Sequence, residues 1–91
     1  MSVRLRLFYP ALERLIGRPD DVWAEGATVG ECLEDLVGRN PDARELLFDP
    51  RGVLLKSVYV FVNAESMFKA ELTKPVSERD ELIVAVLATG G

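Results

Sequence analysis

The last apolar segment of the chain constrains the fold more than any other feature. Residues 81–88 read ELIVAVLA, so both faces of a strand formed by this segment are apolar. Such a strand is typical of the middle of a sheet, where other strands flank it and a helix packs on one side. The sequence therefore predicts that the C-terminal strand is central and that earlier strands pair on each side of it.

Two other segments alternate between core-type residues and polar or aromatic ones. In residues 3–9 (VRLRLFY), valine and leucine share one face, while the two arginines and Phe8 share the other. In residues 57–63 (SVYVFVN), three valines alternate with Tyr59 and Phe61. A period of two is the pattern of a half-buried strand, so both segments are predicted to join the sheet.

The segment TVGECLEDLVGR, residues 28–39, carries the signature of the main helix. Thr28 is a preferred N-cap residue, and Glu31 stands three positions later, which completes a capping box. Four apolar residues follow the spacing of one buried helix face: Val29, Leu33, Leu36 and Val37. Pro41 limits the extension of the helix, because the residue before a proline disfavours helical angles.

Shorter segments complete the predicted architecture. Residues 10–17 form a short turn or helical piece that Gly17 and Pro19 stop, residues 21–25 form a strand that pairs back onto the first, and residues 41–48 form a further helical turn. The pattern of residues 66–76 leaves open whether they add a short edge strand. The result is one small α+β domain over residues 1–91. A mixed sheet of four to five strands packed on one main helix is the β-grasp, or ubiquitin-like, fold.

Composition excludes several classes of function. The chain has no histidine, one cysteine and no glycine-rich phosphate loop, so self-contained catalysis and a metal site are not expected. Its 11 lysines and arginines are scattered through a chain of net charge −4, which argues against nucleic-acid binding. No apolar run is long enough to cross a membrane, and the first residues have no signal-peptide pattern, so we expect a cytoplasmic protein.

Motifs along nearly the whole chain resemble the MoaD/ThiS sulfur-carrier family. They are VRLRLFYPALERLIG, like the family's opening strand and its continuation; ATVGECLEDL, like its helix start; ELLFDPRGVLLKSVYVFVNAES, like its longer branch; and PVSERDELIVAVLATGG, like its acidic turn, last strand and final Gly-Gly. Arg79 replaces the glycine that is usual in the acidic turn, which we interpret as local turn variation. The resemblance implies a β-grasp carrier similar to the small subunit of molybdopterin synthase.

The resemblance also implies a role for the last four residues, ATGG. In the family, an activating enzyme of the MoeB/ThiF type, similar to ubiquitin-activating enzymes, uses ATP and magnesium to adenylate the C-terminal carboxylate. The carboxylate then becomes a thiocarboxylate. Gly91 would thus be the reactive residue of a protein co-substrate that is not itself an enzyme and binds no cofactor. Glycine has no Cβ, so Gly90, with the small Thr89 and Ala88, would let a flexible tail enter a narrow active site.

A second set of residues is predicted to dock onto partner proteins. These residues alternate with the core positions of the strands, and the β-grasp order places them together on the helix-free face of the sheet: Phe8, Tyr59, Phe61, Ile83, Ala85 and Leu87. A contiguous exposed apolar patch marks an interaction site. Partial cover by the stems of Arg4 and Arg6, or burial in a homodimer, is the alternative.

Two features that invite a chemical role are better explained by structure. Cys32 lies on the helix with the apolar face, so we expect a buried small hydrophobic residue rather than a sulfur-transfer thiol. Asp80 and Glu81 are consecutive, so on a strand they point to opposite faces and cannot act on one substrate. They are predicted to be turn charges before the last strand.

The sequence therefore predicts a sulfur carrier for cofactor biosynthesis. The resemblance makes molybdopterin synthase the first acceptor, with its large subunit as the partner that receives the tail. Carriers for thiamine or cysteine biosynthesis are the nearest variants. A ubiquitin-like modifier, joined to lysines through Gly91, and a plain interaction domain with incidental glycines are the alternatives.

Overall fold

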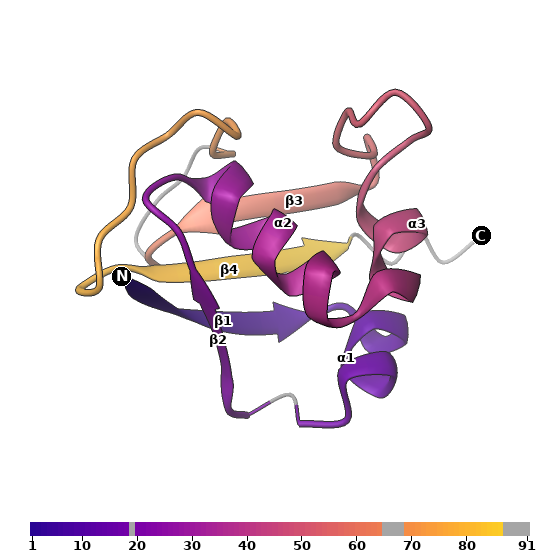
Figure 1. Cartoon of the computed structure of the whole chain (residues 1–91), viewed down its shortest axis with the longest axis horizontal. Helices are drawn as coiled ribbons and strands as arrows, with labels where there is room; N and C mark the ends of the chain where they lie inside the picture. The colour runs from indigo at the N-terminus through magenta and orange to yellow at the C-terminus, as the bar shows by residue number, and fades with distance from the viewer. Residues whose placement is uncertain (19, 65–68, 87–91) are drawn as a thin grey trace.

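The sheet is mixed and contains the last strand in its interior. The computed structural model describes residues 1–18, 20–64 and 69–86. Within these ranges four strands pair in the spatial order β2–β1–β4–β3 (Figure 1): β1 is Ser2–Phe8, β2 is Val22–Glu25, β3 is Val58–Val62 and β4 is Glu81–Val86. β4 runs parallel to β1 and antiparallel to β3, while β2 runs antiparallel to β1. The predicted central position of the last strand is confirmed.

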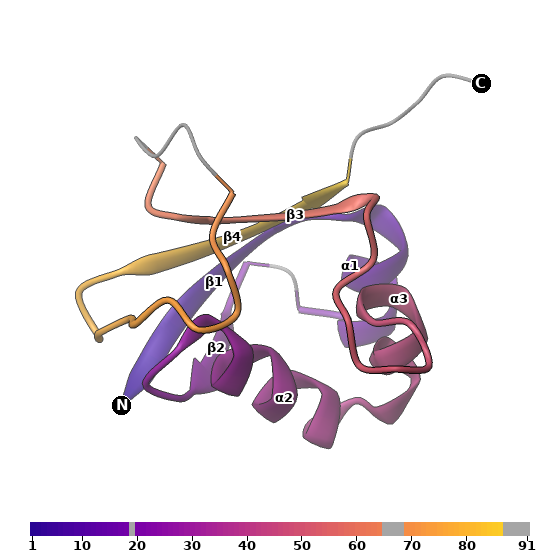
Figure 2. The same ribbon diagram turned by 90° about the horizontal axis from the view of Figure 1, so that it is seen from above.

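In the sequence, one helix of the described residues lies between β1 and β2, and the other helical elements lie between β2 and β3. They are α1 (Pro10–Ile16), α2 (Val29–Arg39), the 3-10 turn η1 (Pro41–Ala43) and α3 (Arg44–Leu47). Figure 2 shows α2 lying along one side of the sheet. α1 ends where Gly17 takes a left-handed φ of 79°, which glycine adopts without a Cβ clash. The predicted stop at Gly17 and the helical turn within residues 41–48 are both confirmed.

The hydrophobic core lies between α2 and the sheet. The strands contribute alternate residues, all buried: Val3, Leu5 and Leu7 from β1, Val58, Val60 and Val62 from β3, and Leu82 and Val84 from β4. α2 contributes the face predicted from its sequence, together with Cys32. Full burial of an aliphatic side chain of this size stabilises the fold by about 1.5–3 kcal/mol, so this layer fixes which face of each strand points inward.

Thr28 caps α2 as predicted, but Glu31 completes the cap differently. The Thr28 hydroxyl accepts a hydrogen bond from the Glu31 amide at 3.2 Å. The Glu31 carboxylate accepts from the amide of Ala27 at 3.0 Å, one residue before the position that a capping box uses. The amides of the first two helix residues, Val29 and Gly30, donate to carbonyl oxygens within residues 72–74. The backbone amides at the start of α2 are therefore hydrogen-bonded to other groups of the protein.

The segment that the sequence left open adds no strand within the described residues 69–76. A single bridge joins Pro75 to Thr28. No helix in the described ranges is long and apolar enough to span a membrane. A four-stranded mixed sheet packed on one main helix is the β-grasp architecture predicted from the sequence.

Candidate functional site on the open face of the sheet

The face of the sheet that points away from α2 is built from alternate strand residues. The core residues of β1, β3 and β4 point toward α2, so the residues between them point the other way. The strand register aligns these outward residues in rows that cross the sheet. One row is Phe8, Ala85 and Tyr59; the next is Arg6, Ile83 and Phe61; the third begins with Arg4 and Glu81. We call these residues the open face.

The open face becomes more apolar toward the end of β4. The row with Arg4 and Glu81 is charged, the row of Ile83 carries one charge, and the row of Ala85 carries none. Val86 is the last described residue of β4, where it pairs with β3. The uncharged row is therefore the one nearest to the described end of β4.

The structure places together the five docking residues that it describes. They are Phe8, Tyr59, Phe61, Ile83 and Ala85. Phe8 is the most exposed of them, with 52% of its surface accessible, and the other four are half-buried. The remaining predicted residues lie outside the described residues: Leu87, Ala88, Thr89, Gly90 and Gly91. The docking role itself stays a prediction.

Cationic side chains border the aromatic rings of the open face. The Arg6 guanidinium carbon lies 5.4 Å from the centroid of the Phe8 ring, and the Lys69 ammonium lies 4.7 Å from that of Tyr59. Each cation is attracted to the ring face, and each side-chain stem covers apolar surface. The sequence offered an alternative in which arginine side chains cover these rings. This alternative is confirmed in part, because Arg6 packs over Phe8 but leaves about half of it exposed.

Sequence reasoning missed Trp23, which extends the open face onto β2. Trp23 pairs with Arg4 in the β1–β2 register, so both side chains point to the same side of the sheet. The Trp23 side chain is exposed, and the Arg4 guanidinium carbon lies 5.9 Å from its ring centroid. The signal that identifies Trp23 is its position between Val22 and Ala24, because a strand residue between two core residues faces outward.

The open face carries both positive and negative groups, and the Asp21 carboxylate, which accepts from Trp23 Nε1 at 3.0 Å, is one of the negative ones. Arg4, Arg6 and Lys69 lie on it, and the Arg6 guanidinium pairs with the Glu81 carboxylate at 3.6 Å. Glu25, on the same side of β2, is paired with the N-terminal ammonium at 3.2 Å. The whole chain has a net charge of −4. This face therefore presents apolar rings bordered by charges of both signs.

Asn63 and Asp80 fix the start of β4 to the end of β3. Asn63 has a left-handed φ of 68°; its Oδ1 accepts from the Glu81 amide at 2.9 Å, and its Nδ2 donates to Asp80 at 3.0 Å. Asp80 also accepts from the Ser77 amide at 2.8 Å. These hydrogen bonds hold the pKa of the Asp80 carboxyl below its ordinary value, and the bond from Asn63 has the largest effect. Asp80 is thus a turn residue, as predicted, and Arg79 has no left-handed φ, so its turn does not require glycine.

Cys32 has no access to solvent. It is fully buried in α2, and this burial raises the pKa of its thiol above the ordinary value. Because the thiolate is the reactive form of cysteine, a buried thiol with a raised pKa is inert. The structure agrees with the predicted structural role. Over the described ranges, no cluster of cysteine and acidic side chains could hold a metal ion.

Comparison with solved structures shows similarity along the full length of the chain. Small archaeal modifier protein 1 from Haloferax volcanii is 30% identical, with a TM-score of 0.84 and 100% of both chains covered. A chain in the BexX/CysO complex of Amycolatopsis orientalis is 28% identical, with a TM-score of 0.75 over 96% of this chain and 99% of that one. CysO of Mycobacterium tuberculosis is 26% identical, with a TM-score of 0.74 over 93% and 100%. No protein-family model and no curated protein sequence matches the chain.

Proposed function

Because this chain belongs to the ThiS/MoaD-like family of ubiquitin-like β-grasp proteins, with small archaeal modifier protein 1 and CysO, we propose that it carries sulfur on its C-terminus. Gly91 provides the carboxylate that is activated. Gly90, Thr89 and Ala88 provide a tail narrow enough to enter an enzyme active site. The chain acts as the protein co-substrate of an activating enzyme and of an acceptor enzyme.

Activation and sulfur loading follow from the chemistry of a carboxylate. A carboxylate is a poor electrophile, because its substitution would have to expel oxide. Attack of a Gly91 carboxylate oxygen on the α-phosphorus of ATP forms an acyl-adenylate and releases pyrophosphate. A sulfide nucleophile then attacks the acyl carbon, and AMP leaves with the electron pair of the broken C–O bond. The product is a thiocarboxylate whose sulfur can be passed to an acceptor.

The observation that carries this proposal is the position of the uncharged row of the open face. Phe8, Ala85 and Tyr59 lie beside Val86, the last described residue before the tail. A partner that docks on this row is therefore next to the start of the tail. Docking of a rigid sheet at that point fixes where the tail begins and lowers the entropic cost of bringing Gly91 to a reactive centre.

We propose two kinds of partner for the open face. One is an adenylating enzyme of the MoeB/ThiF type, which uses ATP and magnesium. The other is an acceptor enzyme, for which the large subunit of molybdopterin synthase stays our first proposal and enzymes of thiamine or cysteine biosynthesis are the variants. Support for a dedicated partner comes from the similar chain of Amycolatopsis orientalis, which was solved in the BexX/CysO complex.

Mass spectrometry of the C-terminal peptide tests the proposal. The protein is incubated with ATP, magnesium, sulfide and a MoeB/ThiF-type enzyme and then cut with trypsin after Arg79. The released peptide, DELIVAVLATGG, contains neither methionine nor cysteine, so a sulfur-for-oxygen mass change is not confused with side-chain oxidation. We expect this change only when ATP is present. An unmodified peptide, with an enzyme shown to load another carrier, would contradict the proposal.

A pair of glycine variants separates tail access from general effects of substitution. Gly90→Ala adds a Cβ inside the proposed channel and should reduce loading by about a hundredfold, the scale of a small misplacement of a reacting group. Gly38→Ala adds the same atom on α2, where no atom beyond the adjacent residues and the local helix backbone lies within 4 Å of the new Cβ, and should load normally. Equal loading of both variants would exclude a narrow channel.

A second candidate function, protein modification, is favoured by the similarity to small archaeal modifier protein 1. In this case a lysine amine attacks the activated Gly91 carbonyl and forms an isopeptide bond. Trypsin digestion of whole-cell protein would then yield lysine-containing peptides that carry DELIVAVLATGG as a branch. Branched peptides without any thiocarboxylate would identify a modifier, and thiocarboxylate without branched peptides would identify a dedicated sulfur carrier.

A further inference from the structure

β2 is an edge strand whose outer side can be identified from one hydrogen bond. The Gly26 amide donates to the Met1 carbonyl at 3.1 Å, which makes these two residues a hydrogen-bonded pair of the β1–β2 ladder. Such pairs alternate along an antiparallel ladder, so Ala24 also faces β1 with its backbone groups. Trp23 and Glu25 therefore direct their N–H and C=O groups outward, away from the sheet.

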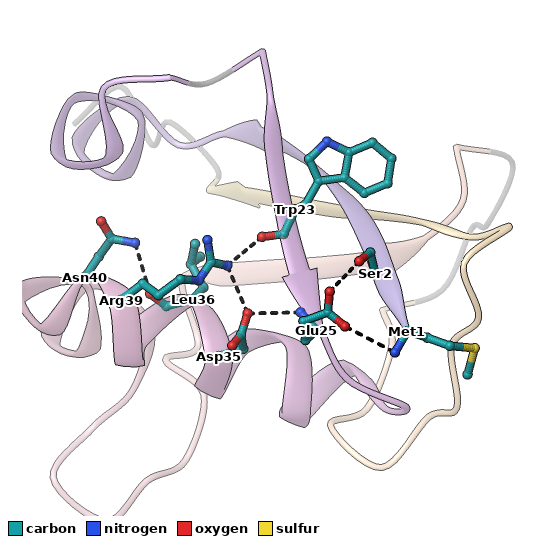
Figure 3. A network of polar contacts seen from close by, with 8 residues as sticks. All are labelled: Met1, Ser2, Trp23, Glu25, Asp35, Leu36, Arg39 and Asn40. Atoms are coloured by element: carbon teal, nitrogen blue, oxygen red, sulfur yellow. Dashed lines mark hydrogen bonds and ion pairs between the residues drawn. The ribbon is translucent and has the colours of Figure 1, made fainter.

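Two charged side chains of α2 form hydrogen bonds with these outward backbone groups (Figure 3). Asp35 accepts a hydrogen bond from the Glu25 amide at 2.9 Å, and Arg39 donates one to the Trp23 carbonyl. Asp35 and Arg39 are themselves joined at 2.9 Å, one helical turn apart. The pair thus supplies an acceptor and a donor where the backbone of a further strand would supply them. A strand edge with free backbone groups is a template for pairing with another chain, and charged residues are one means of blocking it.

We propose that the outer edge of β2 is a strand-addition site that the Asp35–Arg39 pair holds closed, and that its occupant, when the pair is removed, is β2 of a second copy of this chain. The site adjoins the open face at Trp23 but uses different groups of that residue. It pairs through backbone groups in the plane of the sheet, whereas the docking face uses side chains that project from it.

The sequence of β2 is self-complementary for this contact. Two β2 strands arranged antiparallel and centred on Ala24 place Trp23 of one copy opposite Glu25 of the other. Each such pair exchanges two hydrogen bonds, and the twofold axis generates the second pair. The small Ala24 lies at the centre, where the two backbones approach most closely. The Glu25 carboxylate is already paired with the N-terminal ammonium of its own chain, which limits repulsion between the copies.

The closing side chains can leave the edge without disturbing the core. The side chains of Arg39 and Asp35 are 53% and 31% exposed. A hollow of about 260 Å³ runs beside the edge, with Val22 and Trp23 on one side and Leu36 and Arg39 on the other. Removal of the pair therefore uncovers backbone groups next to existing space, with the apolar side chain of Leu36 beneath it.

Sedimentation velocity of a double variant tests this proposal, with a second carboxylate–guanidinium pair as the control. Asp35→Ala/Arg39→Ala should raise the weight-average mass toward twice that of the native chain as concentration increases. Glu34→Ala/Arg44→Ala removes a pair that joins α2 to α3 at 2.7 Å, in which both side chains are about half exposed and neither forms a hydrogen bond with β2. It should sediment like the native chain. A double variant that keeps the native mass at every concentration would overturn the proposal.

A third variant locates the contact, and an exchange measurement tests the closure itself. Adding Glu25→Pro to the double variant removes the outward N–H and the side-chain contacts of Glu25 with Ser2 and the N-terminus, but no backbone hydrogen bond to β1, so it should return the mass to the native value. A dimer that survives this change would place the contact elsewhere and overturn the proposal.

Hydrogen exchange tests the closure of the edge by Asp35. In Asp35→Ala alone, the Glu25 amide should exchange hydrogen about tenfold faster, the scale of one lost hydrogen bond. Unchanged exchange would show that Asp35 does not close the edge.

Discussion

Removing the Phe8 side chain tests whether the uncharged row of the open face is a docking surface. Phe8 is 52% exposed in the free chain, so about half of its surface remains to be buried in a complex. Full burial of a phenylalanine side chain is worth about 1.5–3 kcal/mol, so the remaining half is worth about 0.8–1.5 kcal/mol. Because 1.4 kcal/mol corresponds to a factor of ten, Phe8→Ala should weaken binding to the activating enzyme about tenfold.

Steady-state kinetics of loading measure this effect. The change lies on the sheet and leaves the Gly91 carboxylate untouched, so the KM for the carrier should rise about tenfold while kcat stays the same. The rate of ATP-dependent pyrophosphate release is followed as carrier concentration is varied. Urea unfolding is measured in parallel, because the buried half of Phe8 also contributes about 1 kcal/mol to stability, and rates are compared where both proteins are folded.

Val53→Ala is the matched control for Phe8→Ala. Val53 is an apolar residue of the loop between α3 and β3, and it is 53% exposed, nearly the same fraction as Phe8. It lies outside the rows of the open face, so its truncation should leave KM unchanged. A native KM for Phe8→Ala, or an equal rise for both variants, would refute the assignment of the docking surface to the open face.

Three further predictions concern the elements that support this face. Asn63→Ala should be less stable in urea than Asn63→Gly by about 1 kcal/mol, because both lose the same hydrogen bonds but only alanine is strained at a φ of 68°. The lowered pKa of Asp80 stabilises the fold above the ordinary carboxyl pKa, and this stability is lost as pH falls through the lower, folded value. Asp80→Asn should therefore show a shallower loss of unfolding free energy than the native chain as the pH falls below the ordinary carboxyl pKa. Gly26→Ala should lower the thermal midpoint, because its Cβ would lie 2.7 Å from the Cys32 backbone nitrogen, whereas Gly38→Ala should raise it through helix propensity.

The elements that short-range patterns specify could be predicted from the sequence. The period of two in β1 and β3, the apolar character of β4 and the spacing of buried residues in α2 each identify an element and its inner face. The sheet order follows once β4 is central, because β1 and β3 then have to flank it. Residues of the open face could be predicted for the same reason: they occupy the positions between the core residues.

Contacts between segments that are distant in the chain could not be predicted in this way. The amides at the start of α2 are satisfied by carbonyl groups of residues 72–74, and nothing in the local pattern of either segment encodes that pairing. The second half of the predicted capping box failed for a related reason, since Glu31 bonds to Ala27 rather than to the cap residue. The contact of Arg39 with Trp23 likewise depends on where α2 crosses the end of β2.

The open face and the β2 edge could both bind another protein, but only the groups of the β2 edge are blocked by other side chains of the chain. On the open face, Phe8 and Tyr59 stay accessible although burial would stabilise the chain, and cations border them instead of a covering helix. At the β2 edge, the Asp35–Arg39 pair occupies backbone groups that could bind any extended strand. Backbone pairing is indifferent to sequence, whereas side-chain docking discriminates between partners. Under the proposed function, a carrier that meets first an activating enzyme and then an acceptor gains selectivity when the β2 edge is closed and the open face is left accessible.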